Sequence, residues 1–311
     1  MNVQEELAAA RRRNDWNPDA WSGAPPEDVV GNRNEDIERA AATTRYQVFL
    51  ADGMGGECRP GPLPTTESLS KIANPVLFRK EGGDENAIAM GDVRQGYISD
   101  CYLLAPLAGL ANSAEGRALI KDAITENKNA AGQVASYTVK LHQPESQWIG
   151  KTTFKEVSVT VSATFARDRA VERDASGSKE VWPLVIEKAF AQFIGGYEVL
   201  RRGGSSFDAL QILTGNPAKQ IALGIFRSYG ADQLSSDLAA GKIIEFSTRD
   251  GLGDNRYALV GGHGYLVTGV ENVDGKICVT LFNPVEPDHP TRVPADEIKR
   301  WFAWVNIGSA T

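Results

Sequence analysis

The chain has 311 residues, of which 42% are hydrophobic and 23% are charged, which is the balance of a soluble globular protein rather than a disordered or membrane one. Lys and Arg total 33 against 40 Asp and Glu, so the net charge of −7 repels a phosphate backbone and we expect no nucleic-acid partner. No apolar run reaches the roughly 18 residues that a membrane-spanning helix needs, and the length suits one large domain or two of ordinary size.

Residues 1–75 are polar and rich in Gly and Pro, with RPGPLP at 59–64 as one example. This composition predicts an extended arm with at most a short helix at 34–44. We expect the arm to brace the folded core or to dock the protein, and an inhibitory arm over the active site is the alternative. The first residues lack the apolar run of a secretory signal, so we expect a cytoplasmic protein, with non-classical secretion as an effector left open.

Two apolar stretches predict helices. DCYLLAPLAGLAN at 100–112 has helix length and no polar face, so we expect a buried helix with Cys101 at its beginning. Residues 182–200 carry apolar side chains at helical spacing until Gly195 and Gly196 weaken the pattern. The first of these helices places a candidate nucleophile at a helix N-terminus.

Alternating and β-branched runs predict strands. The segments at 136–142 and 155–163 alternate between apolar and polar residues, as half-buried strands do. Beyond the glycine pair in GGSS at 203–206, which we interpret as a hinge, the chain becomes β-rich. The expected strands there are KIIEFST, GYLVTGVE, KICVTLFN and WFAWVNIG.

The predicted fold class is therefore α+β, with a helical first lobe, a β-rich second lobe and a cleft between them. We expect an arm at 1–75, a first lobe at 76–204 and a second lobe at 205–311. Sites are commonly built in clefts of this kind. The pattern gives no oligomeric state.

The cysteines are three in number, Cys58, Cys101 and Cys278, which disfavours a disulfide framework and favours a reducing compartment. No two of them have zinc-finger spacing, and the three histidines form no HExxH pair, so we expect no metal site with soft ligands. For Cys58 and Cys278 we expect ordinary core roles, because unreactive cysteines are usually buried.

Cys101 has the surroundings that a nucleophilic thiol requires. The thiolate is the reactive form, and a helix N-terminus favours negative charge on a cysteine placed there. Gln95 precedes it by six residues, and its amide group is able to donate to an oxyanion together with the Cys101 N–H. Gly96 lets the backbone approach a substrate closely.

His263 is the candidate base, because it lies between glycines at the start of a predicted strand. Asn283 ends the next strand, so a hairpin would bring its amide beside the imidazole and hold one tautomer. We expect structural roles for His142, at a strand end, and for His289, in a loop.

The run QGYISDCYLLA at 95–105 resembles the active-site motif of the calpain family, Q-G-x-x-G-D-C-W-x-L-A. Further blocks follow in family order: 182–204, Leu213–Gly215, GHGYLVTGV at 262–270, Phe282–Pro284 and Asp296–Ile307. The resemblance implies a papain-like cysteine protease fold and an endopeptidase that acts on protein substrates through a thioester intermediate. It implies that Cys101, His263 and Asn283 form the triad, with Gln95 as the oxyanion donor.

The chain departs from the family pattern at three positions near these motifs. Ser99 stands where the family usually has glycine, and Tyr102 stands where it has tryptophan, beside an unchanged cysteine. Val285 replaces the tryptophan after Asn-Pro, and the acidic, tryptophan-rich loop that follows in the family is missing.

The resemblance also raises calcium. Asp92 and Glu187 match acidic calcium ligands of the family's first lobe, so a calcium ion there remains open, but we expect no required cofactor. Calcium prefers six to eight oxygen ligands, and we do not expect the second-lobe site to survive. We interpret Glu286, Asp288 and Asp296 as solvated loop charges.

Two other classes of function remain open. One is a degenerate protease core kept as a binding module, which the complete set of triad residues disfavours. The other is a thiol acyltransferase, such as a transglutaminase, or an amidase. Such enzymes more usually orient the histidine with an aspartate.

Overall fold

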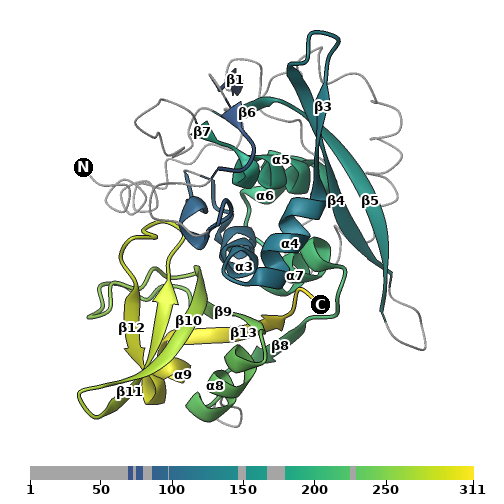
Figure 1. Ribbon diagram of the computed structural model, residues 1–311. Coiled ribbons are helices and arrows are strands. Elements are labelled where there is room, and N and C mark those ends of the chain that lie inside the picture. The colour runs from purple at the N-terminus through teal and green to yellow at the C-terminus, as the bar shows by residue number, and fades with distance from the viewer. Residues whose placement is uncertain are drawn as a thin grey trace.

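A computed structural model describes residues 69–72, 75–79, 86–96, 98–145, 152–166, 179–224 and 229–311 (Figure 1). Most of the predicted arm, its short helix at 34–44 and Cys58 lie outside the described residues. The described ranges include all of the predicted catalytic residues and both calcium candidates.

Helices and strands are interspersed along the chain, which confirms the α+β class. The helices are α3 (Cys101–Ala111), α4 (Ala114–Ala123), α5 (Trp182–Ile194), α6 (Tyr197–Leu200), α7 (Ser206–Thr214), α8 (Ala231–Ala239) and α9 (Ile298–Trp301), with 3-10 turns η3 (Met90–Asp92) and η4 (Ala295–Glu297). The strands are β1 (Leu69–Lys71), β2 (Pro75–Val76), β3 (Ile124–Lys128), β4 (Val134–Glu145), β5 (Thr153–Ser162), β6 (Thr164–Ala166), β7 (Lys179–Glu180), β8 (Lys219–Ala222), β9 (Ile243–Thr248), β10 (Gly264–Val273), β11 (Lys276–Phe282), β12 (Thr291–Pro294) and β13 (Phe302–Gly308).

Helix α3 lies in the middle of the molecule and confirms the helix predicted at 100–112 (Figure 1). All of its residues are buried, as an apolar stretch without a polar face requires. Gly109 lets the helix backbone approach the C-terminal sheet. A Cβ at this position would lie 2.5 Å from Ile243 Cγ2 and 2.8 Å from Leu266 Cδ1. The helix therefore packs directly against β9 and β10.

The first half of the chain has more β-structure than a helical lobe implies, because it contains the antiparallel sheet β3-β4-β5. The alternation at 136–142 and 155–163 gives the two long strands β4 and β5. Helix α5 ends where expected, since Gly195 has φ 111° and Gly196 has φ 117°, values that favour glycine.

The second half forms a six-stranded antiparallel sheet in the order β12-β11-β10-β9-β13-β8. The four strands predicted there are β9, β10, β11 and β13, and all four are confirmed. The edge strands β8 and β12 were not predicted, because each has only four residues. Asp274 and Gly275 have φ of 51° and 84°, as a tight turn between β10 and β11 requires.

The segment predicted as a hinge makes a close contact. A Cβ on Gly204 would lie 2.4 Å from Tyr102 Cε2, so the backbone there packs on an aromatic ring of α3. Helix α7 begins directly afterwards, and its buried Leu210 and Ile212 join the same core as α3. The boundary near residue 204 stays a prediction.

Two apolar cores meet at β9 and β10. Ile243 and Leu266 belong to the core around α3, whereas their neighbours Ile244, Tyr265 and Val267 belong to the core on the other side of the sheet. This is the alternation that a strand buried on both faces produces. The sheet is thus fixed from both sides close to His263.

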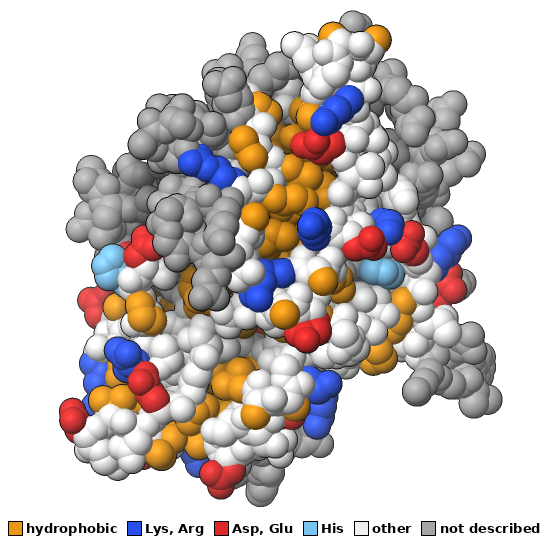
Figure 2. Space-filling model, viewed as in Figure 1, with side chains coloured by type: hydrophobic (Ala, Val, Ile, Leu, Met, Phe, Trp, Pro, Cys, Tyr) orange, Lys and Arg blue, Asp and Glu red, His pale blue; other side chains and the backbone are white. Residues whose placement is uncertain are grey.

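No helix in the described ranges has the length and apolar character that a bilayer crossing requires. On the face shown in Figure 2, acidic and basic side chains are interspersed, and hydrophobic side chains gather in its upper half. The exclusion of nucleic acid stays a prediction.

Candidate active site

Cys101 is the first residue of α3 and follows the N-cap residue Asp100. The N–H groups of Leu103 and Leu104 both donate to the Asp100 carbonyl, at 2.9 and 3.0 Å, which closes the first turn of the helix. Cys101 forms no disulfide, and 9% of the residue is exposed. The N–H groups of this first turn give the thiol an environment that favours negative charge.

Immediately before β10, His263 is held by two hydrogen bonds to Thr248, one with its hydroxyl and one with its backbone N–H. Its N–H donates to Thr248 Oγ1 at 2.9 Å, and the Thr248 N–H donates to its carbonyl at 2.9 Å. The Tyr265 ring and the imidazole pack in a T-shaped arrangement with 4.9 Å between ring centroids. The residue is 3% exposed, so backbone and ring contacts both restrict the imidazole.

The imidazole and the Asn283 amide are in direct contact. Asn283 Oδ1 lies 2.8 Å from His263 Nε2, and it also accepts from the Val285 N–H at 3.1 Å. An amide oxygen only accepts, so this bond requires the proton on Nε2. In the neutral ring Nδ1 then carries the lone pair, and it is the nitrogen that can exchange a proton with a thiol. The hairpin predicted between the two residues is present, with Leu266 paired to Phe282.

The chain at His263 also lies against the start of α3. A Cβ on Gly264 would be 3.3 Å from the Cys101 carbonyl oxygen. The backbone beside the histidine is therefore in near contact with the backbone of the cysteine. Cys101 and Gly264 are far apart in the sequence, and the fold brings their backbones together.

Gln95 is 7% exposed and lies between the two halves of the site. Its backbone N–H donates to the Pro284 carbonyl at 2.8 Å, one residue after Asn283. Its side-chain Nε2 donates to the Ile98 carbonyl at 2.7 Å. An amide NH₂ has two hydrogens, so the second remains able to donate elsewhere.

One of the two calcium candidates already serves as a hydrogen-bond acceptor. Asp92 Oδ2 already accepts from the Ala89 N–H at 2.6 Å and from Trp182 Nε1 at 3.1 Å, which ties η3 to α5. Glu187 is on α5 and 1% exposed. In the described part of the chain, no group of three or more His, Cys, Asp or Glu is arranged to hold a metal. A calcium ion prefers six to eight oxygens, so backbone carbonyls or water would have to supply most of its ligands here, and the calcium site stays a prediction.

Asp288 is an exposed loop charge, as expected, and it also has a partner that was not predicted. The residue's side chain is 65% exposed, but both of its oxygens accept from the Arg94 guanidinium, at 3.0 and 3.0 Å. These hydrogen bonds hold the pKa of Asp288 below its usual value. No local pattern indicated this pair, because the residues are 194 positions apart.

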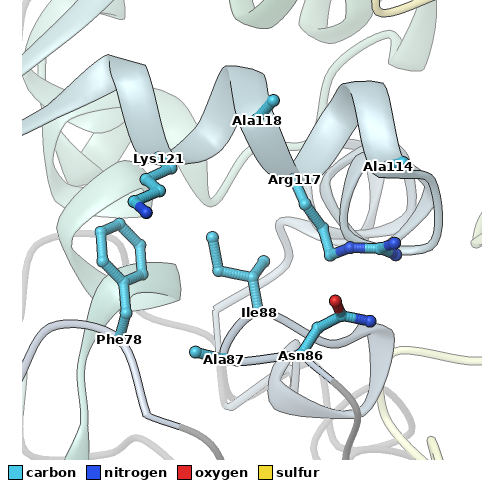
Figure 3. A pocket seen from close by; sticks show the side chains of 8 residues that line it. All are labelled: Phe78, Asn86, Ala87, Ile88, Ala114, Arg117, Ala118 and Lys121. Carbon is cyan, nitrogen blue, oxygen red and sulfur yellow. The ribbon is translucent and has the colours of Figure 1, made fainter.

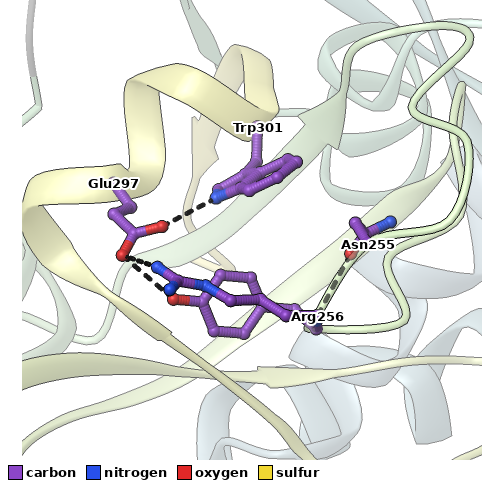
Figure 4. Close-up of polar contacts among 5 residues, drawn as sticks. Asn255, Arg256, Glu297 and Trp301 are labelled. Atoms are coloured by element: carbon purple, nitrogen blue, oxygen red, sulfur yellow. Dashed lines mark hydrogen bonds and ion pairs between the residues drawn. The ribbon is translucent and has the colours of Figure 1, made fainter.

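The loop between β9 and His263 is anchored by a polar and aromatic cluster that was not predicted (Figure 4). Glu297 Oε1 accepts from the Tyr257 hydroxyl at 3.1 Å and pairs with Arg256, while Oε2 accepts from Trp301 Nε1 at 3.2 Å. The Arg256 guanidinium also stacks 4.8 Å from the centroid of the Tyr257 ring. The cluster fastens the middle of this loop to η4 and α9.

Glu245 is fully buried beneath the site, on β9. Its carboxylate accepts from Asn306 Nδ2 at 2.6 Å and from the Ser247 hydroxyl at 3.0 Å. A Cβ on Gly264 would lie 2.7 Å from Glu245 Oε1, so the carboxyl is adjacent to the segment that carries His263. Burial raises the pKa of Glu245 to about 7, and its hydrogen bonds only partly oppose this.

A cavity of about 380 Å³ lies elsewhere, between α4 on one side and Phe78 and residues 86–88 on the other (Figure 3). Phe78 and Ile88 give it an apolar lining, and Arg117 and Lys121 approach it from α4. None of the predicted catalytic residues lines this cavity, so it does not mark the site of the thiol.

Comparison with known proteins finds a matching family and related sequences. Residues 72–301 match the sequence model of the family described as calpain family cysteine protease. Calpain-9 of Rattus norvegicus is 28% identical over 193 residues, covering 59% of this chain and 26% of that protein. The calpain-type cysteine protease ADL1 of Oryza sativa subsp. japonica is 28% identical over 299 residues, covering 91% of this chain and 12% of that protein. The chain thus spans about a quarter or less of the length of these relatives.

The buried carboxyl yields a prediction about stability. Between its ordinary pKa of 4.5 and about 7, Glu245 keeps its proton in the folded state and loses it in the unfolded state. The free energy of unfolding should therefore fall by about 3 kcal/mol as the pH rises through this window, and then level off. Glu245→Gln should remove this slope, as measured by urea unfolding at several pH values.

The matched control is Glu156→Gln, which changes an exposed carboxyl on β5. This variant should keep the pH dependence of the parent protein. A Glu245→Gln variant that still lost stability between about pH 4.5 and pH 7 by the parent's amount would contradict the assignment.

Proposed function

Because the chain belongs to the calpain family of cysteine proteases, we propose that it is a cysteine endopeptidase with Cys101 as nucleophile, His263 as its proton-transfer partner and Asn283 as the orienting residue. The observation that carries the proposal is the 2.8 Å contact between His263 Nε2 and Asn283 Oδ1, on a segment packed against the first turn of α3. The proposal includes a papain-like arrangement of two lobes with α3 at their junction.

The first step of the proposed reaction forms a thioester. Cys101 Sγ attacks the peptide carbonyl carbon as a thiolate, and its proton moves to His263 Nδ1. The oxyanion that forms accepts from the Cys101 N–H and from the second N–H of the Gln95 amide. As the C–N bond breaks, the imidazolium returns its proton to the leaving amine, so the charges balance and an acyl-enzyme remains.

The second step hydrolyses the thioester. His263 takes a proton from water, and the hydroxide formed attacks the acyl carbon in the same oxyanion site. The C–S bond breaks, the imidazolium returns its proton to the departing thiolate, and the carboxylic acid product leaves. Asn283 supports both steps because its oxygen holds the Nε2 proton and keeps Nδ1 directed at the reacting atoms.

Protein substrates follow from the proposed endopeptidase activity, with exposed segments between domains as the expected cleavage sites. The first experiment combines an epoxysuccinyl inhibitor with casein as a general substrate. Covalent labelling of Cys101 together with casein cleavage supports a peptidase. Labelling without cleavage favours an acyltransferase or amidase, and failure to label favours a binding module that has lost its activity.

Substitution of the three residues should give a graded series. Cys101→Ala should abolish turnover, and His263→Ala should lower kcat/KM by roughly 10³-fold because it removes the proton acceptor. Asn283→Ala should lower it by only about 10-fold to 100-fold, since it removes one hydrogen bond from a base that remains. Initial rates on a fluorogenic peptide, with circular dichroism to confirm folding, measure the series.

Cys278→Ala is the control, because this buried thiol lies on β11 and has no role in the proposed reaction. It should leave kcat/KM unchanged. A Cys101→Ala protein with the parent's activity, or an Asn283→Ala protein more impaired than His263→Ala, would contradict the assigned roles.

Calcium should change turnover little. The Asp92 carboxylate is engaged as a hydrogen-bond acceptor within η3 and toward Trp182, so binding an ion there would disturb existing contacts. Peptidase rates in excess chelator and in millimolar calcium should agree. An enzyme that is inert in chelator and activated by calcium would show that an ion assembles the site.

A further inference from the structure

Two segments that belong to different halves of the site are joined by three hydrogen bonds. The Arg94 guanidinium donates twice to the Asp288 carboxylate, at 3.0 and 3.0 Å. At the next residue, the Gln95 N–H donates to the Pro284 carbonyl at 2.8 Å. The segment before α3 is therefore fastened to the loop that follows β11, side by side along two consecutive residues.

We infer that Arg94 and Asp288 form a clasp, and that this clasp positions the Gln95 amide relative to the His263–Asn283 pair. The inference rests on the proposed peptidase function, in which Gln95 donates to the oxyanion. Arg94 and Asp288 are positioning residues in this scheme, because they act on the reaction through Gln95 and Asn283.

Hydrogen bonds within the loop that carries Asp288 connect this residue to Asn283, so a shift of one would displace the other. Asn283 Oδ1 accepts from the Val285 N–H at 3.1 Å, and its carbonyl accepts from the Glu286 N–H at 3.0 Å. The Glu286 carbonyl in turn accepts from the His289 N–H at 3.1 Å. Successive turns thus connect Asp288 to the residue that orients the histidine.

The geometry of the pair distinguishes it from an ordinary surface ion pair. Two parallel N–H···O bonds between a guanidinium and a carboxylate fix direction as well as distance. Arg94 is only 22% exposed at its side chain, so one partner is largely shielded from solvent and held in place. At the next residue, the hydrogen bond from the Gln95 N–H to the Pro284 carbonyl adds a backbone contact between the same two segments.

The experiment uses the full chain and two readouts. Arg94→Gln and Asp288→Asn should each lower kcat roughly fivefold with KM almost unchanged, because an oxyanion donor acts mainly in the transition state. Both variants should also speed hydrogen exchange at the Gln95 amide, measured by mass spectrometry with fragmentation. The exchange readout does not depend on catalysis.

A charge exchange separates pairing from simple loss of a side chain. Arg94→Glu alone and Asp288→Arg alone should both impair kcat, whereas the double variant should recover at least part of kcat and of the amide protection. The matched control is Asp122→Asn, which removes the Lys140–Asp122 ion pair between β4 and α4 at 2.9 Å. It should alter neither readout.

The outcomes separate this inference from the proposed function. If the parent protein cleaves no peptide, the proposed function fails, and the exchange readout still decides whether the clasp exists. Unchanged Gln95 exchange in both single variants would overturn the clasp. Faster exchange with an unchanged kcat would overturn its positioning role in an active enzyme.

Discussion

The direct packing of helix α3 on strands β9 and β10 determines the geometry of the whole candidate site. Two glycines permit it. A side chain at Gly109 would overlap Ile243 and Leu266, and a side chain at Gly264 would crowd the Cys101 carbonyl and Glu245. Because α3 carries the thiol at its first turn and β10 begins beside the histidine, the distance between these elements sets the distance between the thiol and the imidazole. Interiors are close-packed, so such a contact has little freedom to vary.

Hydrogen bonds then fix the side chains of the candidate site that this apolar packing brings together. The His263–Asn283 bond fixes one tautomer, and the bonds from Arg94 and Gln95 fasten the predicted oxyanion donor to the same loop. Glu245, in contrast, does not stabilise the fold at neutral pH. A buried carboxyl with a pKa raised to about 7 reduces the free energy of unfolding there. Its position next to Gly264 places this unfavourable group within the interface that the site requires.

Local patterns predicted the elements that are long and regular. The apolar run at 100–112 and the strands on both sides of His263 were recognisable because burial imposes a period on the sequence. Helices α4, α7 and α8 were missed, since each has only nine or ten residues and their apolar side chains are few or adjoin glycines. The three-stranded sheet in the first half was predicted only in part: β4 and β5 were recognised as strands, whereas β3 and the pairing of all three were not.

Contacts between distant residues were not predictable from the sequence. Glu245 is an acidic residue within the strand sequence KIIEFST, and nothing in the local sequence shows that its side chain is buried. Arg94 and Asp288 carry charges typical of loops, and only the fold makes them partners. Asp92 matched a calcium ligand by resemblance, whereas its hydrogen bond to Trp182 required knowledge of where α5 packs.

The central claim is that Cys101 is a thiol activated by His263, and its alkylation by iodoacetamide tests this most directly. We predict a rate at Cys101 that stays high from about pH 5 to about pH 9 and that becomes steeply pH-dependent in His263→Ala, as for an ordinary thiol. A rate that rises with pH in the parent protein, and that His263→Ala leaves unchanged, would contradict it.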